Sequence, residues 1–162
     1  MAAATRSQTP GTILATIGAA AERDPDRPAI LAPGRAPMLH GQLAHAVREG
    51  VEQLRQLGIA RSDRVALVLP NGAALAVASL TVCCAAVCAP LNPDFKTAEF
   101  RFHLADLGVS AVIVPHGLPT PARQVAAELG LPVLELRVPE GAGAGRFVLS
   151  GPAAAAPSTD PP

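Results

Sequence analysis

The longest charge-free run in the chain extends from Val65 to Leu91, and it limits the possible folds more than any other feature. A run of this length is enough to cross a bilayer as a helix. However, Pro70-Asn71-Gly72 interrupts it early, and residues 73–89 are rich in Ala, Val, Ser, Thr and Cys rather than in Leu, Ile and Phe. We therefore predict a strand, a tight break and a helix buried on all sides in an α/β core, with no membrane span.

Apolar strands and helices alternate along the rest of the chain. Short apolar runs without polar alternation indicate strands covered on both faces, at residues 65–69, 87–89 and 111–114, and a fourth strand is predicted at 132–136. The segments between them predict helices at residues 73–86, 97–107 and 121–129. This order is typical of an α/β fold with a mostly parallel sheet and helices on both faces.

A short helix and a small hairpin are predicted ahead of this layer. Thr12 is suited to cap a helix at its N-terminus, and Pro33-Gly34 separates two short apolar strands, 29–31 and 37–39. The clearest helix of the chain is 41–57, because its apolar residues recur at steps of three and four while its charged residues lie on the other side. Gly58 then ends it.

Composition excludes several kinds of partner. The net charge is zero, there is no Trp or Tyr, and only four Phe are present among 162 residues. A nucleic-acid binder needs a basic surface or aromatic platforms for bases, so we expect no nucleic-acid partner.

Three cysteines, Cys83, Cys84 and Cys88, all lie in the apolar helix region. An odd number in one segment argues against a secreted disulfide framework and for a reducing compartment, the cytoplasm. They lack a fourth ligand at zinc-finger spacing, so we interpret them as small buried hydrophobic residues.

The usual catalytic and binding motifs do not occur in this chain. It has no phosphate loop of the GxxxxGK[ST] type, and GAGAG at 141–145 leads into an apparent strand rather than a helix, which favours a flexible turn. His40, His45, His103 and His116 are scattered, and Lys96 is expected at the surface. We therefore assign no catalytic, cofactor-binding or metal-binding residue. In open α/β sheets the loops after the strands line a site, here 70–72 and 90–96.

A set of short motifs nevertheless resembles the N-terminal region of the adenylate-forming (AMP-binding) superfamily, of the acyl-CoA synthetase type. No single motif is specific, but their order is. They are PMLHGQL at 37–43, LGI at 57–59, SDRVA at 62–66, LPNG at 69–72, PLNP at 90–93, and EF at 99–100 with LADL at 104–107. PLNP followed by EFRFHLADL is most similar to the oxalate–CoA ligase branch.

The resemblance implies the fold of an incomplete N-terminal subdomain and a role in ATP-dependent activation of a carboxylic acid, followed by transfer to CoA. ATP, magnesium and CoA are implied for the full-length family, and none of them for this segment alone. The family's phosphate-binding loop and catalytic lysine would lie beyond Pro162. We expect residues 1–11 to be a disordered arm, 12–149 the partial subdomain and 150–162 a Pro/Ala-rich linker or truncated end.

Three functions remain open from the sequence. The first is an N-terminal fragment of an acyl-CoA synthetase, inactive alone, whose partner is the remainder of the enzyme or a completing chain. The second is a truncated, non-catalytic paralogue that acts as an interaction or regulatory module. The third, a stand-alone nucleotide-binding protein, is disfavoured by the missing phosphate loop. A partial domain exposes apolar surface, so self-association is also expected.

Overall fold

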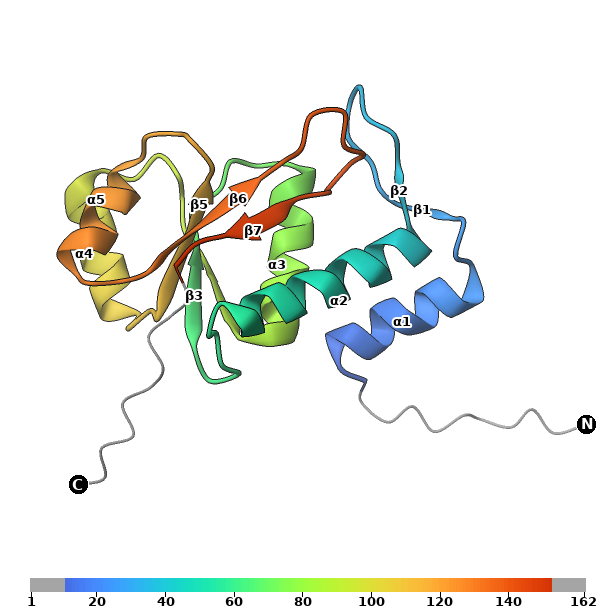
Figure 1. Cartoon of the computed structure of the whole chain (residues 1–162), viewed down its shortest axis with the longest axis horizontal. Coiled ribbons are helices and arrows are strands. Elements are labelled where there is room, and N and C mark those ends of the chain that lie inside the picture. The colour runs from blue at the N-terminus through green and yellow to red at the C-terminus, as the bar shows by residue number, and fades with distance from the viewer. Residues whose placement is uncertain (1–10, 153–162) are drawn as a thin grey trace, which may run out of the picture.

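A five-stranded sheet runs through the computed structural model, which describes residues 11–152 (Figure 1). The strand order is β4-β3-β5-β6-β7; the first four are parallel, and β7 is antiparallel to β6. Their bounds are β3 Arg64–Leu67, β4 Val87–Pro90, β5 Ala111–Pro115, β6 Val133–Arg137 and β7 Val148–Ser150. The predicted fold class, an α/β fold with a mostly parallel sheet, is confirmed.

Helices cover both faces of this sheet. On one face lie α1 Ile13–Arg23, α2 His40–Gln56 and α3 Ala73–Ala85, and on the other lie α4 Thr97–Asp106 and α5 Pro121–Glu128. The alternation of side chains along β3 divides the core accordingly. Val65 and Leu67 join the cluster beneath α2 and α3, whereas Ala66 joins the cluster beneath α4 and α5.

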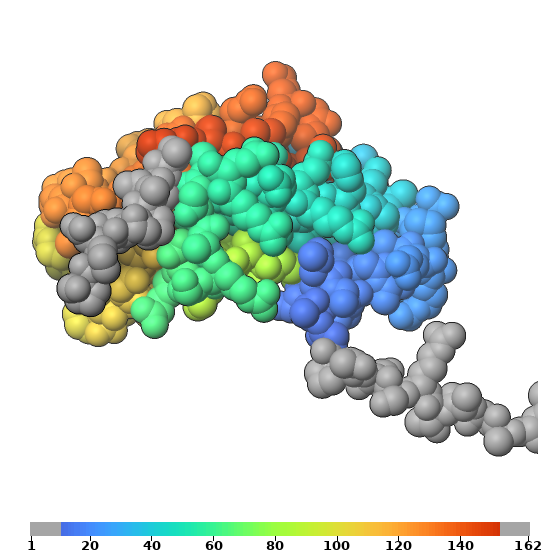
Figure 2. All heavy atoms as spheres, turned by 60° about the horizontal axis from the view of Figure 1, so that its bottom comes forward, coloured from blue at the N-terminus to red at the C-terminus, as the bar shows by residue number. Residues whose placement is uncertain are grey.

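The predicted short helix and hairpin precede the sheet. Thr12 Oγ1 caps α1 by accepting a hydrogen bond from the N–H of Ala15 at 3.2 Å. The strands β1 Pro28–Ile30 and β2 Met38–Leu39 then pair antiparallel. Figure 2 shows α1 and α2 side by side on one face of the molecule, with part of α3 visible beneath them.

Burial along α2 follows the sequence pattern. Leu43, Val47, Val51 and Leu54 are all buried, and Gly58 takes the left-handed conformation, φ +84°, that closes the helix. Among residues 11–152, no helix combines the length and the apolar character that crossing a membrane requires.

Burial of the apolar run was predicted wrongly at two elements. Along α3 the buried positions are Val77, Ala78, Thr81, Val82 and Ala85, while Ala76 and Cys83 are exposed. β4 is an edge strand of the described sheet and pairs only with β3, and Val87 at its start is 49% exposed. The cysteines are consequently not buried together: Cys83 is exposed and the other two are half-buried.

The predicted domain boundaries fall mostly outside the described residues. Of the expected arm, 1–11, the structure describes only Gly11; of the expected linker, 150–162, it describes Ser150, Gly151 and Pro152. Ser150 is the last residue of β7.

Candidate functional site

The direction of the crossovers reverses between β3 and β5. The chain leaves β3 through α3 on one face to reach β4, and then leaves β4 through α4 on the opposite face to reach β5. β3 and β5 are adjacent in the sheet. In open α/β sheets, ligands bind beyond the carboxyl ends of the strands at such a switch point. The topology therefore points to the edge formed by the ends of β3, β5 and β6.

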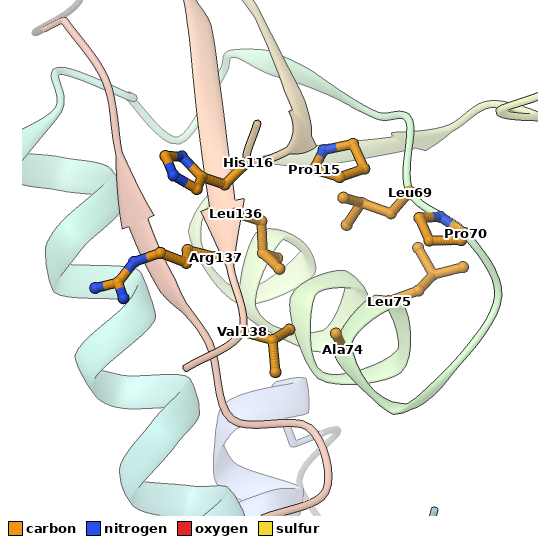
Figure 3. Close-up of a pocket in the computed structure, with 9 residues that line it drawn as sticks. All are labelled: Leu69, Pro70, Ala74, Leu75, Pro115, His116, Leu136, Arg137 and Val138. Carbon is orange, nitrogen blue, oxygen red and sulfur yellow. The ribbon is translucent and has the colours of Figure 1, made fainter. Parts of the chain in front are cut away.

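A hollow of about 320 Å³ lies at this edge. Leu69 and Pro70 follow β3, Ala74 and Leu75 begin α3, and the remaining lining residues come from the ends of β5 and β6. These are Pro115, His116, Leu136, Arg137 and Val138. In Figure 3 the side chains of His116 and Arg137 extend to the side opposite Leu69, Pro70 and Leu75. The hollow is therefore mainly apolar, with its polar side chains on one side.

One of the two polar lining residues, His116, belongs to a charged cluster. The Nδ1 atom of its imidazole is hydrogen-bonded to a carboxylate oxygen of Glu135, on β6. Arg123, on α5, donates to the other oxygen of Glu135 at 2.5 Å and to the carbonyl oxygens of Pro115, at 2.7 Å, and Leu118, at 3.1 Å. The cluster thus fastens α5 to the carboxyl ends of β5 and β6, beside the hollow.

The same contacts lower the pKa of Glu135. The hydrogen bond from His116 is the main cause, and the hydrogen bond from Arg123 adds to it. An ionised carboxylate can only accept, so Glu135 accepts from the Nδ1–H of His116 and fixes the orientation of the ring. A carboxylate-oriented imidazole is one half of a general-base arrangement. None of the other lining residues is a serine, cysteine or threonine nucleophile.

The other histidines and Lys96 lie apart from this cluster. His40 opens α2, His45 pairs with Glu49 at 3.2 Å on the exposed side of that helix, and His103 stacks on Phe95 with ring centroids 4.9 Å apart. Lys96 is exposed, as predicted. Its backbone N–H donates to Glu99 Oε2 at 2.8 Å, where it caps α4.

Of the two loops expected to line a site, the first contributes to this hollow. Pro70 contributes to the hollow at the switch point, and Pro70, Asn71 and Gly72 line a smaller one of about 260 Å³ beside it. The 90–96 loop lies beyond the end of β4 and contributes no lining residue to either hollow. The Glu135 cluster was missed. The available signal was a charged residue inside an apolar run, Val133-Leu134-Glu135-Leu136.

The glycine-rich turn at 141–145 is fixed to the loop between β1 and β2 and to α3. Arg35 donates to the carbonyl oxygen of Ala142 at 2.8 Å, and the N–H of Ala144 donates to the carbonyl oxygen of Ala36 at 2.9 Å. A Cβ added at Gly145 would lie 2.5 Å from Val77 Cγ2. Gly145 therefore packs closely against α3, and the open side of the turn lines the hollow of about 260 Å³ together with Arg35 and Arg146.

Metal ligands do not gather in the part of the chain that the structure describes: no three His, Cys, Asp or Glu residues there are placed to hold an ion.

Comparison with known proteins gives consistent matches over most of the chain. The family model described as "AMP-binding enzyme" matches residues 17–154. A probable CoA ligase of Humulus lupulus is 33% identical over 133 residues, which are 82% of this chain and 25% of that protein. An oxalate–CoA ligase of Arabidopsis thaliana is 31% identical over 111 residues, 67% of this chain and 22% of that protein. The chain thus spans about a quarter of the length of these relatives.

A solved structure shows the same fold. The ATP-bound MatB of Rhodopseudomonas palustris superposes with a TM-score of 0.69 and 20% identity, over 82% of this chain and 26% of that one. At this identity the likeness concerns the fold alone.

Proposed function

Because the chain belongs to the AMP-binding enzyme family, we propose that it is the N-terminal part of an AMP-forming acid–CoA ligase and has no ligase activity by itself. The observation that carries the proposal is the coverage: most of this chain matches only about a quarter of each ligase. In the whole enzyme, ATP, magnesium and CoA would serve to activate a carboxylic acid as an acyl-adenylate and to transfer it to a thiol.

The residues of this chain would supply the frame of that enzyme rather than its chemistry. Of the motif-bearing segments, LPNG at 69–72 and PLNP at 90–93 follow β3 and β4 at the carboxyl ends of these strands, whereas the others lie in β2, α2, the start of β3 and α4. The absence of a GxxxxGK[ST] motif from the sequence argues against a phosphate loop within this segment. The similarity to an oxalate–CoA ligase favours a short carboxylic acid as substrate.

The partner would be the remainder of the ligase, on the same chain or on another. Exposed apolar side chains on β4 and α4 support this, since Val87 is 49% exposed and Phe102 64% exposed. The same surface would favour self-association when it is uncovered. We place the protein in the cytoplasm, where its free thiols would stay reduced.

Complementation tests this proposal. A ligase whose segment matching residues 17–154 has been removed is co-expressed with this chain, and pyrophosphate release is followed with ATP and oxalate. We expect release only when both chains are present, and none with a Val77→Asp version, which places a charge in the core. Release by the 162-residue chain alone would contradict the inactivity, and failure of the two chains to associate would contradict the completing role.

A second candidate is a non-catalytic module that binds a partner protein. It is favoured by the same exposed residues, Val87 and Phe102, if they are permanent features of a free protein. Denaturant unfolding followed by circular dichroism separates the two candidates. A transition that does not move when the rest of the ligase is added supports an independent module, whereas a shift to higher denaturant concentration on its addition supports a part of the enzyme.

A further inference from the structure

The two hollows at the carboxyl edge of the sheet adjoin each other. The larger one, of about 320 Å³, and the smaller one, of about 260 Å³, share three lining residues, Pro70, Ala74 and Val138. Figure 3 shows Ala74 and Val138 close together at one end of the larger hollow. The two hollows therefore form one groove that passes the ends of β3 and β6, and we call it the switch groove.

One half of the switch groove is mainly apolar. Leu69, Leu75 and Leu136 line the larger hollow, and Leu69 and Leu136 also belong to the buried core under α2 and α3. The core packing therefore fixes the position of these walls. The volume of this hollow lies within the range of pockets that hold small molecules, about 300–1,000 Å³. This half of the groove suits the hydrocarbon body of a small ligand.

The other half of the switch groove is positively charged. Arg35, Asn71 and Arg146 line the smaller hollow, and all its other lining residues are alanine, glycine, proline or valine. The three polar residues come from three different loops, β1–β2, β3–α3 and β6–β7. Two guanidinium groups and one amide thus meet around a single space whose lining contains no carboxylate.

The protein holds each of the two arginines through one nitrogen atom. Arg35 Nη1 donates to the carbonyl oxygen of Ala142 at 2.8 Å, and Arg146 Nη1 donates to Glu49 Oε2 at 3.3 Å. A guanidinium group carries five N–H donors in a fixed plane, so each arginine has further donors to offer to a ligand. The Arg146–Glu49 pair is about half exposed and contributes little to stability by itself.

We propose that the switch groove binds a small phosphate monoester with an apolar body. The phosphate group lies among Arg35, Asn71 and Arg146, and the apolar body lies in the larger hollow. Because a phosphate monoester has three terminal oxygens, it accepts from all three side chains at once. Its charge, about −1.5 to −2 at pH 7, matches the two guanidinium groups. A carboxylate has two oxygens and a single charge, so it matches this set of donors less well.

Such a site differs from a phosphate loop, since its donors are side chains from three loops rather than consecutive backbone N–H groups. It also does not depend on the ligase role. The alternative for the two arginines is a purely structural one, in which Arg35 and Arg146 only fasten the loop between β6 and β7. Ligand comparison on the wild-type chain and matched variants separate these two uses.

Isothermal titration calorimetry of the 162-residue chain with phenyl phosphate, inorganic phosphate and benzoate tests the proposal. Phenyl phosphate should bind most tightly, because it alone combines a phosphate group with an apolar ring. We expect inorganic phosphate, which lacks the ring, and benzoate, which lacks the phosphate, each to bind at least about tenfold more weakly. Absence of phenyl phosphate binding, equal affinity for inorganic phosphate, or tighter binding of benzoate would each overturn the proposal.

Variants in each half of the groove test the assignment of its parts. Arg35→Gln and Arg146→Gln should each weaken the binding of phenyl phosphate by about tenfold or more. Arg55→Gln removes the same charge from the exposed side of α2, outside the groove, and should leave binding within about twofold of wild type. Leu75→Ala should weaken the binding of phenyl phosphate but not that of inorganic phosphate. Arginine variants that bind like wild type would contradict the site.

Glu49→Gln distinguishes ligand binding from fastening of the loop. It removes the ion pair with Arg146 but keeps both arginines, so binding of phenyl phosphate should be retained or tightened. If Glu49→Gln loses as much affinity as Arg146→Gln, Arg146 acts only by holding the loop, and the proposal fails. Circular dichroism of each variant verifies that the fold is retained, and the comparison of the three ligands on the wild-type chain does not depend on any variant.

Discussion

The two faces of the sheet are covered in different ways. On the first, α1, α2 and α3 pack on each other as well as on the strands, and α2 and α3 come so close that Gly50 touches Thr81. On the second, α4 and α5 form a thinner cover whose rim is held by ion pairs, Arg101–Glu128 between the helices and Arg123–Glu135 to the sheet. Apolar packing is insensitive to pH, whereas carboxylate pairs are not, so the two faces should respond to different perturbations.

The largest expected effect is on the first face. Val77, on α3, is fully buried, and Val77→Asp would place an unpaired carboxylate in the core. Such a group costs several kcal/mol, roughly the whole stability of a small domain, about 5–15 kcal/mol. We expect cooperative unfolding in urea to be lost. Ala76→Asp, on the exposed side of the same helix, is the control and should stay within about 0.7 kcal/mol of wild type. Equal losses would mean that α3 is not seated as described.

The next largest effect is on the second face. Phe100, on α4, is fully buried against the strands, and Phe100→Ala should lower the free energy of unfolding by about 3–5 kcal/mol. Phe102, two residues on, is 64% exposed, so Phe102→Ala should change it by less than about 0.5 kcal/mol. Urea midpoints of the two variants measure the difference. If Phe102→Ala proved as costly as Phe100→Ala, the exposed position of Phe102 would be wrong.

A smaller effect tests the close contact between α2 and α3 on the first face. A Cβ added at Gly50 would lie 2.6 Å from Thr81 Cγ2, so Gly50→Ala must push α2 and α3 apart. We expect a loss of about 1–3 kcal/mol, although alanine is the better helix former. Gly18→Ala, inside α1, is the matched control. Its Cβ would meet only the end of the flexible Arg48 side chain at 3.4 Å, so it should be neutral or stabilising. A stabilising Gly50→Ala would refute the tight packing.

The buried side of a helix can be predicted from the sequence only when its apolar and polar residues alternate with the helical period. In α2 the spacing of Leu43, Val47, Val51 and Leu54 identifies the buried side directly, because charged residues mark the other side. The apolar α3 lacks that contrast, so its composition suggested burial all round and its exposed side, at Ala76 and Cys83, was missed. Apolar composition shows that a helix can be buried. Which side is buried can be predicted only when polar residues occupy the opposite side.

Features set by strand order and by distant pairs could not be predicted. That β4 lies at an edge depends on β5 pairing with the far side of β3, which no local pattern around Val87 reveals. Likewise Glu135 meets His116 and Arg123 because β5, β6 and α5 converge, although these residues lie 19 and 12 positions away from it. The hollow at the switch point could not be predicted either, because its lining comes from the ends of three strands that are distant in the sequence.

The smallest effect is the pH dependence of the second face. Contacts with His116 and Arg123 hold the pKa of Glu135 below its ordinary value, which is about 4.3 in an unfolded chain. A carboxylate whose pKa is lower in the folded state stabilises the fold at pH values above the unfolded pKa. This contribution is lost as the pH falls through the folded pKa. The wild-type chain should therefore exceed Glu135→Gln in stability at pH 7, and the gap should close below about pH 4.

The control for this prediction removes the main cause of the shift. In a His116→Gln background, the pH-dependent part of the Glu135→Gln effect should shrink, since the hydrogen bond from His116 contributes most to the lowered pKa. Urea unfolding at several pH values between 3 and 7 measures both gaps. A gap that stays constant, or widens as the pH falls, would mean that Glu135 is not held as a carboxylate. The attachment of α5 to the ends of β5 and β6 would then depend on apolar packing, as the packing of the first face does.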